Sequence, residues 1–395
     1  MVSMAILDCD SHLFESRTTW RDYIDPGMRD AALAIEDDEL GWPWLTWRGQ
    51  RLYPVESQVP GDAAVIGRER TRRAEGLAPL ERYDDLVPAH YTDAVARAAR
   101  IEAWGLDASV VFPNFGLIWE DMLAADRPAL LANLRAANRW MANAVADGNG
   151  RLLGVGHVTL ADLDWLDDEL DALARAGIKL AMTAPAPVDG KRLSHPDLDR
   201  AWASFCDHDV APVFHVGGFP SPFHPAWYES DPEPGDRLLD SVFLWAAPAI
   251  ALSDMILLGT FERHPTLRVG VIELSAGWVP MFLLNIDGAN DFYVLRHGPL
   301  YPLPSRPSEY FLRHVRVGAL AYERPDKLIR QLGDNTFMFG SDWPHAEGIA
   351  DPVGDYERHV ADRLTDTARS QLFGGNLSWL LGARATQTGQ APRRV

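Results

Sequence analysis

The chain has 395 residues, a net charge of −19 and a pI near 5.0. Hydrophobic residues make up 47% of it and charged residues 24%, which is the balance of a globular protein with a large core. The acidic charge disfavours nucleic acid and anionic membrane surfaces as partners, because both require a basic face. We therefore expect a small-molecule substrate as the partner, and neither nucleic acid nor a membrane.

Cysteine content and the start of the chain predict a cytoplasmic location. Cys9 and Cys206 are the only cysteines, so the sequence implies no disulfide framework and fits a reducing compartment. The N-terminus carries acidic residues in place of a basic segment followed by a long apolar one, so no signal peptide is predicted. No apolar run reaches transmembrane length. The expected assembly is a homo-oligomer, specifically a dimer.

Short apolar runs alternate with longer amphipathic segments along the chain. The runs are too short for helices and predict eight strands, at 5–10, 108–112, 152–158, 178–182, 210–215, 267–273, 314–320 and 336–341. Apolar spacing predicts helices at 94–104, 128–146, 163–176, 196–206, 238–261, 278–287 and 325–332, and two more helices near the C-terminus. Eight strands that alternate with helices predict a parallel α/β fold closed into a distorted (β/α)8 TIM barrel.

One segment breaks this alternation. Residues 14–90 contain scattered Pro and Gly, the run Gly-Trp-Pro-Trp at 41–44 and an arginine-rich stretch at 68–73. We expect an N-terminal insertion over the barrel mouth, partly helical near its end. The basic stretch fits a solvated helix face, and also a lid or a subunit contact. Residues 1–385 are expected to form a single TIM-barrel domain, and residues 386–395 a polar tail.

Polar side chains end several of the apolar strands, at the edge where a barrel of this kind carries its chemistry. Asp10 and His12 are two residues apart and share one face of the first strand. The other strand ends carry His157, His215, Glu273 and Asp342, and His345 follows three residues after Asp342. Carboxylates and imidazoles that converge at one mouth repel one another or shift their pKa values strongly unless a cation neutralises them. The pattern therefore predicts a metal site.

Several of these residues also have a structural interpretation. His157 fits a hydrogen-bonded core histidine as well as a ligand. Asp342 fits a helix cap, and Glu273 fits a buried partner of an arginine. Glu15, three residues after His12, fits either an acceptor that orients a ligand imidazole or a carboxylate at a helix start.

The chain resembles the amidohydrolase-related proteins of the aminocarboxymuconate-semialdehyde decarboxylase type, which are metal-dependent TIM barrels of the amidohydrolase superfamily. As a set, the matching segments are specific for the family and unspecific for the reaction: DCDSHLFE at 8–15, PVFH at 212–215, FERHPTLR at 261–268, ELSAGW at 273–278 and GSDWPH at 340–345. The resemblance implies metal ligands at Asp10, His12, His215 and Asp342. This chain also departs from the family at two positions. Decarboxylases of the family often carry histidines where this chain has Asp10 and Glu273.

The departures make the site rich in carboxylates. Asp10, Glu273 and Asp342 form a harder ligand set than three histidines, which favours Fe or Mn and leaves Zn open. Three carboxylates also neutralise most of the charge of two divalent ions, so the expected cofactor is one or two divalent ions.

Two reaction classes follow from this site. In the first, metal-bound water serves hydrolysis or decarboxylase-type C–C lyase chemistry, with Glu273 or Asp342 as general base and His345 holding the oxyanion. In the second, Glu273 completes a non-heme diiron site for oxygen-dependent hydroxylation of an apolar substrate. A third interpretation is a non-catalytic binding barrel. It is disfavoured because residues that can bind a metal occupy the ligand positions.

Aromatic residues gather near the predicted mouth. Phe219, Phe223 and Trp227 follow His215, Phe115 follows the second strand, and Trp343 follows Asp342. An aromatic mouth predicts a small to medium, largely apolar or aromatic substrate. Packing among loops is the alternative explanation for these five residues.

Overall fold

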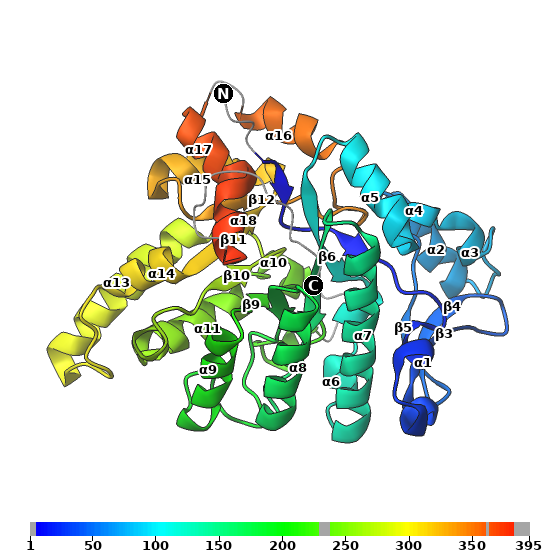
Figure 1. Cartoon of the computed structure of the whole chain (residues 1–395), viewed down its shortest axis with the longest axis horizontal. Helices are drawn as coiled ribbons and strands as arrows, with labels where there is room; N and C mark the ends of the chain where they lie inside the picture. Colours follow the sequence, from blue (N-terminus) through cyan, green and yellow to red (C-terminus); the bar gives the residue numbers. More distant parts are fainter. Residues whose placement is uncertain (1–4, 229–237, 361–362, 383–395) are drawn as a thin grey trace.

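The computed structural model describes residues 5–228, 238–360 and 363–382; the predicted tail at 386–395 lies outside this part of the chain. Parallel strands follow the order β1-β6-β7-β8-β9-β10-β11-β12, and β2 also pairs with β6 (Figure 1). Their bounds are β1 (Leu7–Asp8), β2 (His12–Leu13), β6 (Ala108–Pro113), β7 (Leu152–His157), β8 (Leu180–Met182), β9 (Ala211–Phe214), β10 (Val269–Val271), β11 (Val315–Ala319) and β12 (Phe337–Phe339). Each predicted strand overlaps an observed one, which confirms the α/β barrel.

The barrel closes where its first strand segment meets its last. The backbone N–H of Cys9 donates to the Phe339 carbonyl at 2.8 Å, and that of Asp342 donates to the Asp10 carbonyl at 2.8 Å. The buried carboxylate of Asp8 accepts hydrogen bonds from the backbone N–H and the hydroxyl of Ser341, at 2.9 and 2.7 Å. This seam places the ends of the first and last strands side by side.

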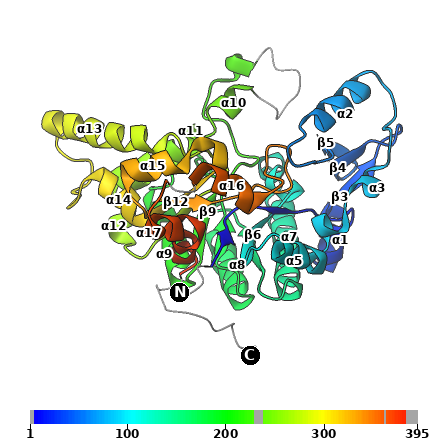
Figure 2. The same ribbon diagram turned by 90° about the horizontal axis from the view of Figure 1, so that it is seen from above.

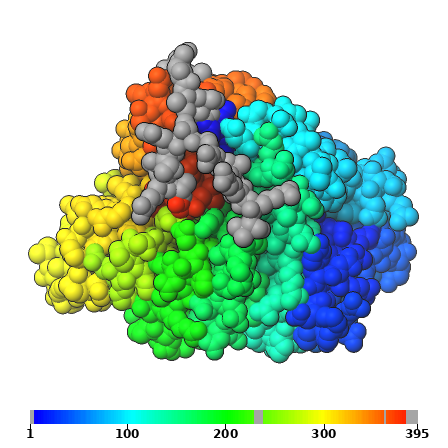
Figure 3. All heavy atoms as spheres, in the orientation of Figure 1, coloured from blue at the N-terminus to red at the C-terminus, as the bar shows by residue number. Residues whose placement is uncertain are grey.

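Helices surround the strands (Figure 1), and in the space-filling view the blue N-terminal segment and the yellow segment around residue 290 form opposite edges of the molecule (Figure 3). On α8 (Leu163–Arg175), the residues Leu166, Leu170 and Leu173 form the buried side, and Asp162 caps the helix by accepting from the Trp165 N–H at 3.0 Å. The predicted helix at 238–261 is wrong as a single element, because three shorter helices cover this range and Gly259, at φ 77°, separates the last two. The helix bounds are α5 (Ala94–Ala103), α6 (Glu120–Leu123), α7 (Arg127–Asp147), α8 (Leu163–Arg175), α9 (Asp199–Asp207), α10 (Leu238–Val242), α11 (Ala246–Leu257), α12 (Thr260–Arg263), α13 (Val279–His297), α14 (Pro307–His314), α15 (Pro325–Leu332), α16 (Pro352–Val360), α17 (Asp366–Ser370) and α18 (Asn376–Leu380). Within the described residues, none of the helices combines the length and the hydropathy that crossing a bilayer requires.

The segment 14–90 forms an antiparallel sheet with short helices around it (Figure 2). The sequence predicts helix near its end but not this sheet. Gln58 accepts from the Ala346 N–H at 3.1 Å, and the Gly61 N–H donates to the Ala346 carbonyl at 3.0 Å. The segment therefore contacts the loop that follows β12. Its elements are α1 (Thr19–Tyr23), β3 (Leu33–Asp37), β4 (Pro43–Trp47), β5 (Gln50–Pro54), α2 (Ala64–Ala74), α3 (Tyr83–Leu86) and α4 (Ala89–Thr92).

Candidate metal centre

Six side chains from four strand ends meet at the carboxyl-terminal edge of the barrel: Asp10 and His12 from the first strand, His215 after β9, Glu273 after β10, and Asp342 and His345 after β12. Their ligand atoms form two overlapping groups, each with all its atoms within 4.8 Å of one another. Both groups contain His12 and Glu273. The first adds Asp10 and His215, and the second adds Asp342 and His345.

The interatomic distances place these donors around a common centre. Nε2 of His12 lies 3.3 Å from Oδ1 of Asp342 and 3.6 Å from Oε2 of Glu273. Nε2 of His215 lies 3.1 Å from that same Glu273 oxygen and 3.4 Å from Oδ1 of Asp10. The structure thus brings together all five residues that the sequence singles out as metal ligands, and His345 with them.

Two of the carboxylates project from strained backbone. Glu273 and Asp342 have φ angles of 56° and 52°, in the left-handed region that a residue with a Cβ adopts at a cost of about 1–2 kcal/mol. Asp342 is held there by its backbone hydrogen bond to Asp10. Such strain persists where the surroundings fix it, and it concentrates at functional sites.

Both strand-end histidines direct Nε2 to the centre. Nδ1 of His12 lies 3.2 Å from the Pro113 carbonyl, and Nδ1 of His215 lies 2.8 Å from the Val216 carbonyl. Because a carbonyl only accepts, each Nδ1 carries a hydrogen and each Nε2 is the nitrogen that faces the other donors, which is the usual orientation of a metal-binding histidine.

Buried atoms without hydrogen-bond partners supply a test of whether a cation fits. Nε2 of His12, Oε2 of Glu273 and Oδ2 of Asp342 are buried, and among the described residues none of them has a hydrogen-bond partner. An unpaired buried polar atom is costly, and a cation would satisfy all three. The imidazole and carboxylate donors suit Mn, Fe or Zn, so the residues fit a divalent metal.

The electrostatics of the centre favour positive charge. Burial and the nearby His345 oppose protonation of His12, but Asp342 and Glu273 outweigh them and raise the pKa of His12 to about 9. Burial raises the pKa of Asp10, and the carboxylates of Asp342 and Glu273 add to this effect. Burial opposes ionisation of Glu273, yet His215, His12 and His345 hold its pKa well below the usual value. The carboxylates of this centre thus stabilise cations beside them.

His345 is fixed between two acceptors. Its Nδ1 lies 2.7 Å from Oδ1 of Asp342, and its Nε2 lies 2.9 Å from Oδ1 of Asn114. Burial opposes the charged form of His345, but Asp342 and Glu273 raise the pKa of His345 well above the usual value. The ring therefore donates from both nitrogens as an imidazolium. Sequence reasoning missed Asn114, although it ends an apolar strand just as the predicted ligands do.

Glu15 and His157 lie outside the two donor groups. The buried Glu15 carboxylate accepts from the backbone N–H groups of Asn114, Phe115 and Gly116 at 3.2, 2.9 and 2.6 Å, so it orients the loop that carries Asn114. Burial raises the pKa of Glu15 to about 7. Nε2 of His157 lies 2.9 Å from Oε2 of Glu120, a partner that the sequence did not indicate.

The five predicted pocket aromatics occupy different environments. Phe219 lines a small cavity together with His215, and it lines a second cavity of about 190 Å³ together with Phe223. Phe115 and Trp343 are buried among other aromatic rings, and Trp227 is 72% exposed. Two of the five therefore line cavities next to a candidate ligand.

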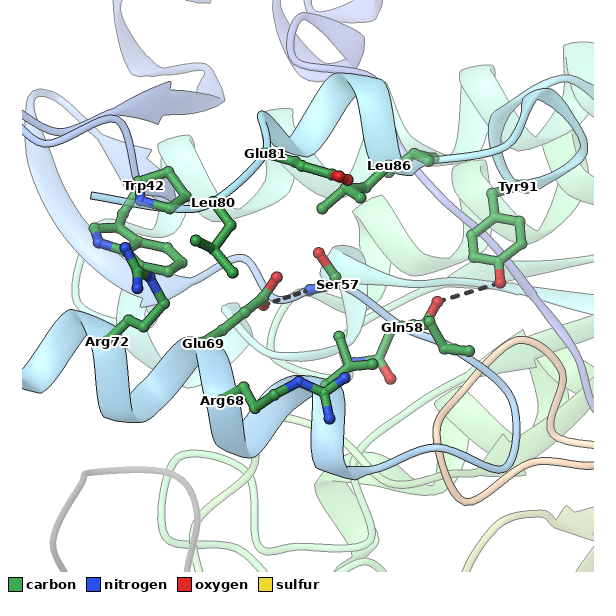
Figure 4. Close-up of a pocket in the computed structure, with 14 residues that line it drawn as sticks. Trp42, Ser57, Gln58, Arg68, Glu69, Arg72, Leu80, Glu81, Leu86 and Tyr91 are labelled. Carbon is green, nitrogen blue, oxygen red and sulfur yellow. Dashed lines mark hydrogen bonds between the residues drawn. The ribbon is translucent and has the colours of Figure 1, made fainter. Parts of the chain in front are cut away.

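A larger cavity of about 300 Å³ lies inside the insertion, between α2 and the chain that follows it (Figure 4). Trp42, Leu80 and Leu86 form much of its apolar wall. The Tyr91 hydroxyl donates to the Gln58 carbonyl at 3.2 Å at its edge. The lining comes from residues 42–91, so this cavity is separate from the strand ends that carry the candidate ligands.

Comparisons with known proteins identify the family and the fold. The model of the amidohydrolase family matches residues 8–376. Among curated proteins, none matches the sequence. An amidohydrolase from Mycobacterium avium subsp. paratuberculosis is 24% identical, with a TM-score of 0.78 over 97% of this chain and 100% of that one. 5-Carboxyvanillate decarboxylase from Novosphingobium aromaticivorans, complexed with manganese, is 18% identical, with a TM-score of 0.64 over 96% of each chain. 2,6-Dihydroxybenzoate decarboxylase from Rhizobium is 16% identical, with a TM-score of 0.61 over 96% of this chain and 99% of that one.

Proposed function

Because the chain belongs to the amidohydrolase family, and is thus a metal-dependent enzyme of the hydrolase or lyase type, we propose that it hydrolyses or decarboxylates a small to medium, largely apolar or aromatic compound. In this proposal Asp10, His12, His215 and Asp342 hold a divalent cation. The observation that carries it is the set of buried donor atoms at the centre that have no hydrogen-bond partner among the described residues.

The bound cation would act as a Lewis acid, polarising a substrate oxygen or lowering the pKa of a water molecule. His345 holds a proton between Asp342 and Asn114 and donates it in the reaction. In decarboxylation that proton goes to the carbon that loses CO2. In hydrolysis it goes to the leaving group, while Glu273, as an ionised carboxylate, accepts the proton of the attacking water.

The surroundings of the centre support the substrate class. Phe219 and Phe223 line the cavities on the His215 side, and aromatic walls with a few polar groups bind aromatic or apolar compounds. The decarboxylases with a similar fold are named for aromatic carboxylic acids. Manganese is the first metal to test, since one of them was crystallised with it.

The direct test is reconstitution of the metal-free protein with Mn, Zn or Fe(II), followed by a panel of aromatic carboxylic acids, esters and amides. We expect CO2 release or hydrolysis that requires the added metal and that Asp342→Asn abolishes. Equal turnover by the metal-free protein would contradict the proposed role of the metal. Turnover that requires molecular oxygen and iron would replace this proposal with the one below.

Iron-dependent oxygenation of an apolar substrate is the second candidate, and the placement of Glu273 favours it. Oε2 of Glu273 faces His12 and His215, at 3.6 and 3.1 Å, while Oε1 lies 3.8 Å from Nδ1 of His345. A carboxylate whose two oxygens face different donors is suited to bridging two ions, and histidine–carboxylate sites suit iron. Elemental analysis of protein purified without oxygen separates the candidates. About two equivalents of iron per chain support oxygenation, whereas one equivalent of Mn or Zn supports the first proposal.

A further inference from the structure

The cavity of about 300 Å³ inside the insertion lies outside the metal centre, and its wall has the composition of a ligand site. Apolar side chains line much of it, although three of them remain exposed, at 42% for Val59, 78% for Leu80 and 39% for Leu86. Exposed apolar side chains that converge on one hollow are typical of binding sites. The volume suits a small compound of one or two rings.

Helix α2 closes one side of this cavity and has no buried face of its own (Figure 4). None of the residues of α2 is buried, and Val65 on this helix lines the cavity. Trp42, on another side of the cavity, is 2% exposed, and its indole N–H donates to the Leu77 carbonyl at 2.8 Å. The cavity is thus held open between a fixed indole and a solvated helix, and an apolar ligand would give α2 a buried contact.

Two of the four arginines on α2 lack a close carboxylate. Arg70 and Arg73 bind the buried Glu56, at 2.7 and 3.2 Å. The other two, Arg68 and Arg72, line the cavity. Among the described residues, the carboxylate oxygen nearest to either of these two guanidinium groups belongs to Asp62 and lies 3.8 Å from Nη2 of Arg68.

This lack of pairing does not reflect a shortage of acidic residues, since the chain has 56 Asp and Glu against 37 Lys and Arg. A guanidinium group binds a carboxylate through two parallel hydrogen bonds, which are stronger than hydrogen bonds between neutral groups. Arg68 and Arg72 are four residues apart and therefore share one side of α2. The cavity combines an apolar wall with a side that attracts anions.

Two glutamates also line the cavity, and neither takes the place of that anion. The Glu69 carboxylate accepts from the Ser57 backbone N–H at 3.0 Å. Glu81 is exposed and lies beside Leu86, on the side opposite α2 (Figure 4). The arginine side of the cavity is therefore left for the anionic group of a ligand.

From these observations we propose that the cavity binds a small apolar carboxylate. Its rings would lie between α2 and the side chains of Leu80 and Leu86, and its carboxylate would face Arg68 and Arg72. The site is independent of the proposed function, since it uses no residue of the metal centre.

Isothermal titration calorimetry with three related probes tests the class of ligand. We expect 1-naphthoate to bind more than about tenfold tighter than 1-naphthalenemethanol or 1-naphthylmethylamine, because only the carboxylate gains charge-assisted hydrogen bonds. Tightest binding of the amine would show that the glutamates determine the preference and would overturn the proposal. Failure of 1-naphthoate to bind would overturn it as well.

Substitutions of exposed residues test the position of the ligand without disturbing the fold. Arg68→Gln should weaken 1-naphthoate binding about tenfold and leave the binding of the alcohol unchanged. Leu80→Asp should weaken the binding of both probes, because it removes apolar contact. Arg82→Gln is the matched control, since the Arg82 side chain is 74% exposed in the same segment but is not among the residues that line the cavity. Equal affinity for 1-naphthoate in Arg68→Gln and Arg82→Gln would contradict the proposed anion position.

Hydrogen exchange separates this site from the metal centre. Bound 1-naphthoate should slow amide exchange in residues 64–74, and it should do so equally in metal-free protein and in Asp342→Asn. Protection confined to the strand ends, or binding that disappears with the metal, would place the ligand in the metal centre and overturn the inference. Neither readout depends on turnover, so failure of the proposed reaction would leave this test intact.

Discussion

Glu273 and His215 end neighbouring strands of the barrel, and Oε2 of Glu273 lies 3.1 Å from Nε2 of His215. The histidine shares its Nδ1 hydrogen with the Val216 carbonyl, so Nε2 and the carboxylate oxygen direct two lone pairs into the same buried space. This arrangement is stable only if a cation or a proton lies between the two atoms.

Removing a ligand should therefore remove the metal. We expect His215→Ala and Asp342→Ala to lose at least about 90% of the bound metal, since removing one donor leaves the remaining carboxylates unsatisfied. Elemental analysis of the purified variants measures this loss. His157→Ala is the matched control and should retain full metal content, because His157 pairs with Glu120 outside the donor groups. A His215→Ala variant with wild-type metal content would remove His215 from the ligand set.

Replacing Glu273 separates its possible roles. Under the hydrolase or lyase proposal, Glu273→Gln keeps one equivalent of metal and lowers kcat by about 10²–10⁴-fold through loss of the general base. Metal analysis and steady-state kinetics on the same preparation give both quantities. A fall from two equivalents to one would instead identify Glu273 as the residue that joins two ions.

Asn114 should act by positioning His345. In Asn114→Ala, Nε2 of His345 loses its acceptor and the ring loses one of two fixed contacts, so we expect kcat to fall by about 10–100-fold with KM changed much less. Metal content should stay at the wild-type level. Asn114→Asp restores an acceptor and should recover part of the lost rate. If the acceptor does not matter, the alanine and aspartate variants will be equally slow.

Glu15 should make stability depend on pH. Burial raises its pKa from 4.5 to about 7 in the folded protein, so the folded state binds the proton more tightly than the unfolded state does. This contribution to the free energy of unfolding is fully present below pH 4.5 and is lost as the pH rises to about 7, a change of about 3 kcal/mol.

Urea unfolding at several pH values, compared between wild type and Glu15→Gln, isolates this group from others that titrate. The wild type should lose stability over this pH range by about 3 kcal/mol more than the variant does. Equal pH dependence in the two proteins would exclude Glu15 as its source.

Much of the fold follows from the sequence because the barrel strands are short apolar runs, several of which end in a polar residue. The runs before His215 and Asp342 are examples, and their carboxyl ends must share one edge of a parallel barrel. The sheet formed by β3, β4 and β5 did not follow, because each strand has only five residues and Gly41, Pro43 and Gly49 lie within or beside them. The break of the predicted helix 238–261 was missed because its apolar residues continue across the break at Gly259.

The sequence likewise predicts only part of the candidate site. Strand-end position predicts which side chains share the mouth, and the structure brings Asp10, His12, His215, Glu273 and Asp342 together there. It does not predict the partners that hold them. The Pro113 carbonyl behind His12 and the Asn114 amide behind His345 lie 101 and 231 residues away in sequence, so their contacts depend on the barrel itself.

The seam between the first and last strands sets the order in which this protein matures. Asp10 and His12 leave the ribosome early, whereas Asp342 and His345 are among the last parts of the barrel to be synthesised. The backbone hydrogen bond from Asp342 to Asp10 forms only when both ends are present. With the proposed ligand set, a nascent chain therefore lacks part of the metal site during most of translation, and the complete site exists only after β12 has been synthesised.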